Sequence, residues 1–309
     1  MLDPDLKDVM ARANRAPPEP SPFPEMLTGE GTGFHPCRAR LTSLRRSATS
    51  RRVPKSGFIE AVKSVRYAGG VANWAEVGAN AWRGAETTTL RLRNGLTVES
   101  APGALVVPLY KEIWYRDDYR LRADPLPRGA TVIDIGANIG MFALYAAVEC
   151  GAARVYAYEP FPGSYALLAR NAERNRVAAI VPVPIAIAGR SGGRSLHLHG
   201  RHGVHSLFGT SDEGVPIECI TLAEAFARDR IERCDFLKLD CEGAEYEILL
   251  AAPPEVFART ARIALEYHDW MTEHHHDELR RLFETHGFAV TSRDHLPSRT
   301  GYLFAKKDG

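Results

Sequence analysis

A glycine-rich loop follows an apolar, strand-like run at residues 131–136 and has the composition of a ligand-binding turn. It reads DIGANIG over residues 134–140. Gly136 and Gly140 let the chain turn sharply and let its backbone approach a ligand, and Asp134 can accept hydrogen bonds. The glycine spacing is GxxxG, whereas a dinucleotide fold uses GxGxxG to hold a pyrophosphate. The loop therefore favours a ligand without a pyrophosphate over NAD.

An acidic residue ends the next strand-like run, at residues 154–158. Glu159 and Pro160 follow this run directly, and the spacing from the glycine loop is the roughly 20 residues at which an acid meets a ribose. A carboxylate there can accept hydrogen bonds from both ribose hydroxyls. The alternative is that Glu159 only caps the helix that follows.

A third polar strand end reads LKLDCEGAE over residues 237–245. Alternation along a strand puts Lys238 and Asp240 on one face, at the carboxyl end where ligands bind. Asp240 can act as a general base towards a substrate hydroxyl or as a ligand to a hard divalent cation. Glu242 and Glu245 fall in the first turn of the next helix, where the helix dipole stabilises carboxylates. A structural role for these two glutamates therefore competes with a role on the substrate side.

The fifth strand-like run ends with Glu266 and His268, which share a face that points towards Asp240. Because imidazole titrates near neutrality, His268 is a candidate base for removing a hydroxyl proton, and a structural histidine is the alternative. Asp240, Glu266 and His268 together can also form an oxygen-rich metal site with one imidazole, although no spacing rule requires it.

These residues are positioned by strands and helices that alternate along the chain, which indicates βαβ units and a mostly parallel sheet covered on both faces. The expected strands cover residues 131–136, 154–158, 180–188, 235–239, 261–267, 288–291 and 302–305. The expected helices cover residues 141–150, 163–175, 222–228, 244–251 and 277–286. The fold class is α/β, and the ligand should lie beyond the carboxyl ends of the strands.

The part of the chain before residue 128 divides into two further regions. Residues 1–55 are rich in proline and arginine and are expected to form a disordered arm. Residues 56–127 form a small α/β lead-in domain, with a helix at 58–67, a hairpin that turns at Asn94-Gly95 and a helix at 105–117. Residues 128–309 form the ligand-binding domain.

The motifs DIGANIG, YEP, LKLDCEGAE and LEYH resemble the FkbM family of S-adenosylmethionine-dependent methyltransferases over residues 118–306. The resemblance implies a class I, Rossmann-like fold with seven strands, of which the last is antiparallel. It also implies that S-adenosyl-L-methionine is the cofactor. Its methionine end would lie against Asp134, Gly136, Asn138 and Gly140, and its ribose against Glu159 and Pro160.

Members of the family include O-methyltransferases of polyketide and sugar hydroxyls. The resemblance therefore implies methyl transfer to a hydroxyl of a small molecule. From their residue types and positions, Asp240, His268, Glu266 and Lys238 are the expected catalytic group. Two alternatives stay open. They are an NAD(P)-dependent oxidoreductase and a non-catalytic binding protein on the same fold.

Three further groups of residues are weaker candidates. His205 and Ser206 lie in a region rich in glycine and histidine that is expected to shape the substrate site. Glu112, Tyr115 and Tyr119 can pack across the cofactor pocket, although core packing is the more economical interpretation. The run at residues 274–276 is three histidines, which point in different directions on a helix and so indicate a solvated helix start rather than one metal site.

Composition excludes several other classes of protein. The formal net charge of +1 gives no general attraction to nucleic acid. No run reaches the roughly 20 apolar residues of a membrane span. Five cysteines without CxxC spacing suggest neither a disulfide framework nor a zinc knuckle, and the N-terminus lacks the apolar core of a signal peptide. A cytoplasmic protein is expected, and its oligomeric state is left open.

Overall fold

The computed structural model describes residues 69–102, 106–199, 204–206, 214–295 and 299–307 of the 309-residue chain. The expected arm at 1–55, the expected helix at 58–67 and Cys37 lie outside the described residues.

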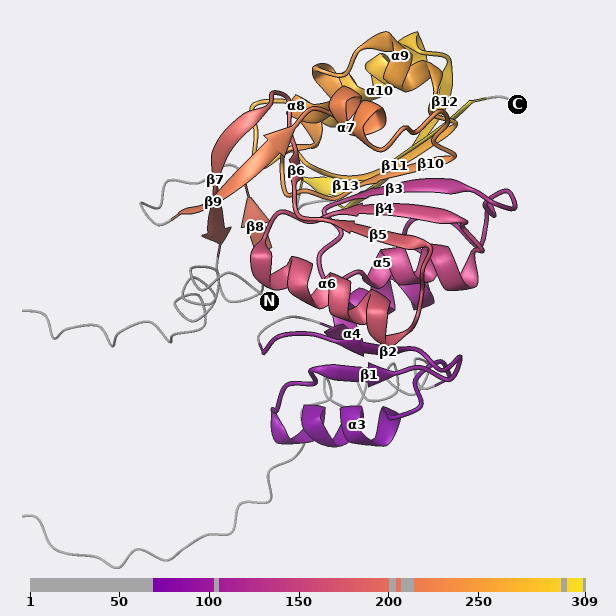
Figure 1. The fold of residues 1–309 in the computed structure, drawn as a ribbon, viewed down its shortest axis with the longest axis vertical. Coiled ribbons are helices and arrows are strands. Elements are labelled where there is room, and N and C mark those ends of the chain that lie inside the picture. Colours follow the sequence, from indigo (N-terminus) through magenta and orange to yellow (C-terminus); the bar gives the residue numbers. More distant parts are fainter. Residues whose placement is uncertain (1–68, 103–105, 200–203, 207–213, 296–298, 308–309) are drawn as a thin grey trace, which may run out of the picture. The chain divides into compact units, whose positions relative to one another are not determined.

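A seven-stranded sheet forms the centre of the described residues (Figure 1), in the order β12-β13-β11-β10-β3-β4-β5. Its strands are β3 (Thr131–Ile135), β4 (Arg154–Tyr158), β5 (Ile180–Val183), β10 (Phe236–Leu239), β11 (Arg262–His268), β12 (Phe288–His295) and β13 (Thr300–Lys307). The last strand, β13, is antiparallel to both of its neighbours, and the other pairs are parallel. This arrangement confirms the α/β class and the antiparallel last strand that the resemblance implies.

Helices cover both faces of this sheet, because alternate residues of each strand point to opposite sides. On β3, Val132 packs in one apolar cluster, whereas Ile133 and Ile135 pack in another. The first face is covered by α5 (Met141–Leu144), its continuation η2 (Tyr145–Glu149) and α6 (Pro162–Arg174). The second face is covered by α7 (Leu222–Arg228), α8 (Glu245–Leu250), α9 (Pro254–Ala258) and α10 (His276–Thr285). Of these helices, only the short α9 was not expected from the sequence.

The lead-in region packs against the first face. Its elements are α3 (Trp74–Arg83), β1 (Thr89–Arg91), β2 (Thr97–Glu99), α4 (Val106–Tyr110) and the π-helical turn η1 (Lys111–Arg116). The hairpin at Asn94-Gly95 and the helix after it are confirmed, whereas α3 was not expected. Val98 and Ile113 share one apolar cluster with Phe142 of α5. The lead-in therefore helps to build the core beside the ligand-binding end of the sheet.

The region after β5 differs from the expectation. A single strand was expected at residues 180–188, but the structure has two, β5 and β6 (Ala186–Ile187), and β6 belongs to another sheet. Pro184 lies between them and lacks the N–H that a ladder needs, so the strand ends before it. The region 189–214, which is rich in glycine and histidine, was expected to be an excursion from the sheet, and no strand was assigned to it from the sequence. A four-stranded sheet in the order β6-β9-β7-β8 forms there, with β7 (Gly192–His199), β8 (Val204–Ser206) and β9 (Gly214–Ile220).

The small sheet has its own apolar cluster, which contains Leu196 and Ile217. Residues of alternating character on β7 and β9 supply it, and that period of two was the available signal. Among the described residues, no helix has the length and apolar character that a membrane crossing requires.

Candidate functional site

A cavity opens at the carboxyl ends of β3, β4 and β10, where a parallel sheet places its ligands. Its walls include seven residues that the sequence singles out at these strand ends. They are Gly136, Asn138, Glu159, Pro160, Lys238, Asp240 and Glu242. Glu112 and Tyr119 of the lead-in region also line it, as do Ala186, Ile187 and Leu196 of the small sheet. The lead-in and the small sheet thus complete the pocket that the central sheet begins.

The glycine loop is shaped by close contact between β3 and β10. Gly136 has a φ of +74°, and a Cβ there would lie 1.8 Å from the backbone oxygen of Asp240. Only glycine therefore fits at this point. The amides of Gly136 and Ala137 both donate to the carbonyl of Tyr158, which ties the loop to the end of β4. Gly140, also at positive φ, packs against Leu168 of α6 and is not one of the cavity-lining residues.

Glu159 is a buried carboxylate on the cavity wall. Its Oε2 accepts the amide of Asn138 at 2.8 Å, and its Oε1 accepts the amide of Phe161 at 2.8 Å. Burial raises its pKa to about 7, although these two amides act in the opposite direction. A carboxylate has about four acceptor sites, so each oxygen can still accept a further hydrogen bond from a ligand hydroxyl.

Asp134 and Lys238 form a buried ion pair, and Lys238 lines the cavity. The two residues are direct neighbours in the β3–β10 pairing, and Lys238 Nζ lies 3.1 Å from Asp134 Oδ1. Nζ also donates to the carbonyl of Gly136 at 2.9 Å and lies 3.8 Å from Asp240 Oδ2. Burial lowers the pKa of Lys238, but the neighbouring Asp134 and Asp240 outweigh it and hold the pKa above its usual value. Lys238 is therefore a fixed cation that joins the glycine loop to Asp240.

Asp134 is completely buried and is not one of the cavity-lining residues. The position that the resemblance implies for it, against the cofactor's methionine end, is therefore not where the structure places its side chain. It instead provides the counter-charge of Lys238, and burial raises its pKa while Lys238 acts in the opposite direction.

A cluster of carboxylates surrounds Asp240. Oxygens of Glu112, Asp240 and Glu266 lie within 4.8 Å of one another. Tyr119 donates to Asp240 Oδ2 at 3.2 Å, and Tyr302 donates to Glu266 Oε2 at 3.1 Å. Burial and the charge of Asp240 raise the pKa of Glu112 to about 7 and that of Glu266 to about 8. Near neutral pH this cluster therefore holds exchangeable protons.

His268 lies between two glutamates of the loop after β10. Its Nδ1 is 3.3 Å from Glu245 Oε1, and its Nε2 is 3.5 Å from Glu242 Oε2. Burial lowers the pKa of His268, but Glu245, Asp240 and Glu242 outweigh it and raise the pKa to about 10. A protonated imidazole donates hydrogen bonds and cannot accept a proton at neutral pH. This charge state disfavours the role of His268 as a base.

Glu242 and Glu245 have different positions although they are close in sequence. Glu242 lines the cavity, and burial and Asp240 raise its pKa to about 7. Glu245 is completely buried and accepts the amides of Cys241 at 2.8 Å and Gly243 at 2.9 Å. Glu245 thus holds the loop in shape, in agreement with the structural alternative for it.

The structure suggests two sets of ligand atoms for a cation near Asp240. One set is Asp240 with Glu242 and His268, and the other is Asp240 with Glu112 and Glu266. The expected set of Asp240, Glu266 and His268 is thus divided between them. A cation in the second set would have carboxylate oxygens only, which suits a hard ion.

The remaining candidates are placed as follows. His205 and Ser206 lie on β8, at the far edge of the small sheet. Tyr115 is 38% exposed and does not line the cavity, unlike Glu112 and Tyr119. Sequence analysis did not select Tyr302. The expected antiparallel last strand could have indicated a role for Tyr302, because Tyr302 pairs directly with Glu266 in the β11–β13 register.

Comparison with known proteins identifies the family. The model of the methyltransferase FkbM domain matches residues 134–290, about half of the chain and all of the strand ends described above. The chain belongs to the FkbM methyltransferase family. This membership confirms an S-adenosylmethionine-dependent methyltransferase and removes the oxidoreductase alternative.

The chain is also similar to individual proteins that are named as methyltransferases. The chain is 31% identical to 31-O-demethyl-FK506 methyltransferase FkbM of Streptomyces tacrolimicus over 235 residues, which cover 66% of this chain and 90% of the relative. It is 24% identical to hexuronic acid methyltransferase AglP of Haloferax volcanii, over 54% of this chain and 72% of the relative. A solved structure, methyltransferase FkbM from Methylobacillus flagellatus, is 18% identical with a TM-score of 0.43. The match covers 63% of this chain and 47% of that one, so this chain spans less than half of the solved protein's length.

Proposed function

We propose that the chain is an O-methyltransferase that methylates a hydroxyl of a small molecule, such as a polyketide natural product or a sugar. The observation that carries the proposal is the Asp240 carboxylate, which lies on the cavity wall with Glu112 and Glu242. Carboxylates accept hydrogen bonds from hydroxyl groups and can take up their protons. The names of the two relatives, a demethyl-FK506 methyltransferase and a hexuronic acid methyltransferase, support an acceptor of this chemistry.

The residues of the cavity fit S-adenosylmethionine. Glu159 is a buried carboxylate with acceptor capacity left over, suited to the two hydroxyls of a ribose. Gly136 and Asn138 present backbone rather than bulk at the loop, and Ala186 and Ile187 offer apolar surface for a base. When bound, the cofactor supplies an electrophilic methyl group on a sulfonium sulfur.

The chain's own residues then have four tasks in the proposed reaction. Asp240 accepts the proton of the acceptor hydroxyl, so that the oxygen can form its new bond to carbon. Lys238 and Tyr119 hold the Asp240 carboxylate in position through the contacts at 3.8 Å and 3.2 Å. Glu242, whose pKa is raised to about 7, accepts a proton passed on from Asp240. His268 stays protonated and positions Glu242 and Glu245.

The same carboxylates can also act as ligands of a divalent cation. The grouping of Glu112, Asp240 and Glu266 favours it, because three carboxylates in one place suit Mg²⁺. Such an ion would bind the acceptor oxygen and lower the pKa of its proton. Full turnover after chelation and dialysis would exclude this version.

The test of the proposed function is methyl transfer to a panel of hydroxylated polyketides and sugars, read as the mass gain of one methyl group. Replacement of Asp240 by Asn should lower turnover about 100-fold or more, since general base catalysis contributes 10²–10⁴-fold. Binding of S-adenosylmethionine should change little. Glu232→Gln, at an exposed position in the loop between α7 and β10, is the matched control. Unchanged turnover in Asp240→Asn would contradict the role of Asp240, and transfer only to amine or carbon acceptors would contradict O-methylation.

A further inference from the structure

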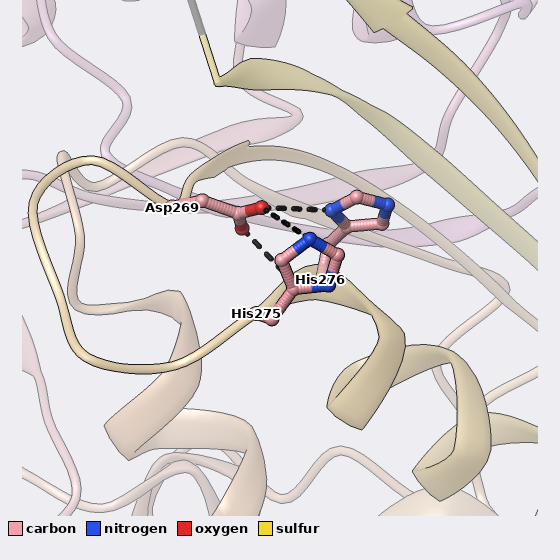
Figure 2. A group of neighbouring side chains, drawn as sticks. All are labelled: Asp269, His275 and His276. Carbon is pink, nitrogen blue, oxygen red and sulfur yellow. Dashed lines mark hydrogen bonds and ion pairs between the residues drawn. The ribbon is translucent and has the colours of Figure 1, made fainter.

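A second cluster of metal-ligating side chains lies beyond the end of β11, outside the cavity. Asp269 directly follows β11, and His275 and His276 begin α10 (Figure 2). The His276 Nδ1 lies 2.8 Å from Asp269 Oδ2, and the His275 Nε2 lies 3.5 Å from the same oxygen. One ligand atom from each residue falls within 4.8 Å of the others.

We propose that Asp269, His275 and His276 form a binding site for a divalent transition-metal ion such as Zn²⁺. Two imidazoles and one carboxylate are a common ligand set for zinc and related ions, and one or more positions would stay open for water. Ligand atoms that bind one ion at about 2.0–2.2 Å lie roughly 3 Å apart. The contacts to Asp269 Oδ2 are of this size.

Two consecutive histidines reach one point because only one of them is inside the helix. His275 is the N-cap of α10 and has an extended backbone, with φ −127° and ψ 141°. The rule that successive helical side chains diverge therefore does not apply to this pair. His274 also lies outside the helix, and its side chain turns to Glu278 and stacks on Tyr246 instead. The expectation that all three histidines cannot share one ion thus agrees with the structure, but two of them share the carboxylate of Asp269.

The carboxylate of Asp269 is held in place by other contacts. Its Oδ1 accepts hydrogen bonds from the hydroxyl of Tyr246 and from the amide of His276. This leaves Oδ2 to face the two imidazoles, as Figure 2 shows. Asp269 is 2% exposed, whereas the side chain of His275 is 53% exposed, so an ion can enter from the solvent side.

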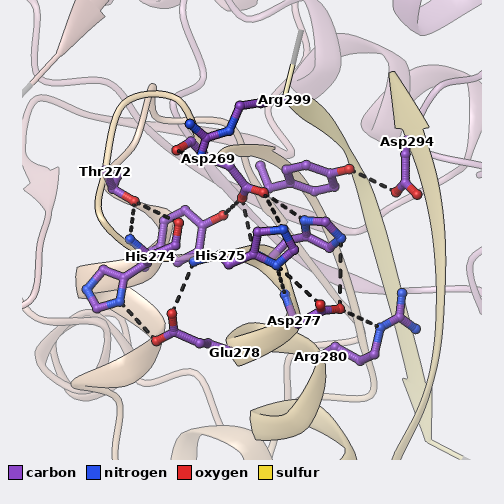
Figure 3. A network of polar contacts seen from close by, with 12 residues as sticks. Asp269, Thr272, His274, His275, Asp277, Glu278, Arg280, Asp294 and Arg299 are labelled. Atoms are coloured by element: carbon purple, nitrogen blue, oxygen red, sulfur yellow. Dashed lines mark hydrogen bonds and ion pairs between the residues drawn. The ribbon is translucent and has the colours of Figure 1, made fainter. Parts of the chain in front are cut away.

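A second carboxylate lies behind both imidazoles (Figure 3). Asp277 Oδ2 is 3.2 Å from His275 Nδ1, and Asp277 Oδ1 is 3.9 Å from His276 Nε2. Each imidazole thus has one nitrogen towards Asp269 and the other towards Asp277. Metal-bound histidines typically donate their other N–H to such a carboxylate. As the N-cap, His275 Nδ1 accepts the amide of Asp277 at 3.4 Å, so on zinc binding it would exchange this contact for donation to the Asp277 carboxylate. The ring of His276 is also fixed by stacking on Tyr267, at 4.2 Å between centroids.

Such an ion would join the end of β11 to the start of α10 next to His268. It would close the loop between Asp269 and His276 and so limit the movement of the strand end that carries His268. This proposal does not depend on the identity of the methyl acceptor, and its test needs no methyl transfer.

The experiment is titration of the untagged, metal-free full chain with Zn²⁺, by calorimetry, and with Co²⁺, by visible absorption. We expect one saturable site per chain, and a thermal midpoint that rises by roughly 5–10 °C when zinc exceeds its Kd about 100-fold. His275→Asn keeps a side chain that can cap α10 but removes the imidazole, and it should weaken zinc binding at least 10-fold. His274→Asn removes an exposed imidazole one residue away and should leave the affinity unchanged.

Two results would overturn the proposal. One is the absence of a saturable zinc site in the unaltered chain, which would leave Asp269 and His276 as an ion pair only. The other is equal zinc affinity in the His275→Asn and His274→Asn variants, which would place the zinc on other histidines.

Discussion

Replacement of Lys238 by Met should strongly destabilise the fold, because it leaves the buried Asp134 without its cation. The Lys238 side chain is 4% exposed and that of Asp134 is 0% exposed, with 3.1 Å between Nζ and Oδ1. Removal of one partner from such a pair costs about 3–5 kcal/mol. For a domain of this size the expected fall in thermal midpoint is on the order of 6–20 °C.

The loss should depend on pH in a defined direction. Burial already raises the pKa of Asp134, and Lys238 acts against this rise. Without Lys238 the pKa of Asp134 in the folded state rises further. A carboxyl group with a raised pKa stabilises the fold at low pH, and this contribution is lost as the pH rises. The difference between the variant and the unaltered chain should therefore be smaller at pH 5 than at pH 8.

Urea unfolding at several pH values measures this difference. Lys306→Met is the matched control, because Lys306 pairs with Asp124 at 2.8 Å on the surface and should cost less than about 1 kcal/mol. The double variant Asp134→Asn/Lys238→Met removes both charges and should recover a large part of the loss. It also keeps the test valid if the single variant fails to fold. A double variant no more stable than the single one, or a single variant as stable as the control, would refute the reasoning.

Two other changes test separate parts of the structure. Burial and Asp240 raise the pKa of Glu266 to about 8, so the stabilisation that its protonated carboxyl group provides is lost as the pH rises to that value. Glu266→Gln, which cannot ionise, should therefore stabilise the chain by an amount that grows from pH 5 to pH 8. The expected gain, measured in thermal scans, is on the order of 2 kcal/mol. A gain in stability that does not vary with pH would contradict the raised pKa of Glu266. Asn171 of α6 bonds to both backbone groups of Glu99 and to the carbonyl of Ile139, and Asn171→Ala should cost about 2–4 kcal/mol in urea unfolding. A cost below about 1 kcal/mol would show that these bonds do not hold the lead-in hairpin to α6.

Much of the site could be predicted because it lies on regular strands. The alternation of side chains along β10 and β11 put Lys238 and Asp240 on one face and Glu266 on the same side, and the parallel register brings their ends together. No knowledge of distant contacts was needed for this, which is why Glu266 beside Asp240 was expected from the sequence, whereas the approach of Glu112 from the lead-in region was not.

The charge state of His268 could not be predicted in the same way. It is set by Glu242 and Glu245, whose positions depend on the loop after β10, where Glu242 has a φ of +53°. A spacing rule does not describe such a loop. The buried pairing of Asp134 with Lys238 was missed for a related reason, since strand order had to be known before the two could be recognised as direct neighbours.

The small sheet and the metal-ligand cluster are two further features that the sequence did not predict. Pro184 ends β5 early and lets β6 join another sheet, so the hydrophobic run at 180–188 resembles one strand in the sequence but is two in the structure. Asp269 meets His275 and His276 because a short loop folds back on the end of β11. The period of two along β7 and β9 was a signal for the small sheet, whereas no local sequence pattern identifies the meeting of Asp269 with the two histidines.

The most direct test of the central claim is calorimetric titration with S-adenosylmethionine of the unaltered chain and its Glu159→Ala variant. Two hydrogen bonds to a carboxylate contribute roughly 1.5–3 kcal/mol each, so the variant should bind at least about 10-fold more weakly. Glu159→Gln, which keeps one oxygen acceptor, should lie between the two, and Glu173→Ala, at an exposed position on α6, should bind as the unaltered chain does. One saturable site that weakens in this order is the result we predict. No binding to the unaltered chain, or an affinity that Glu159→Ala leaves unchanged, would contradict the account.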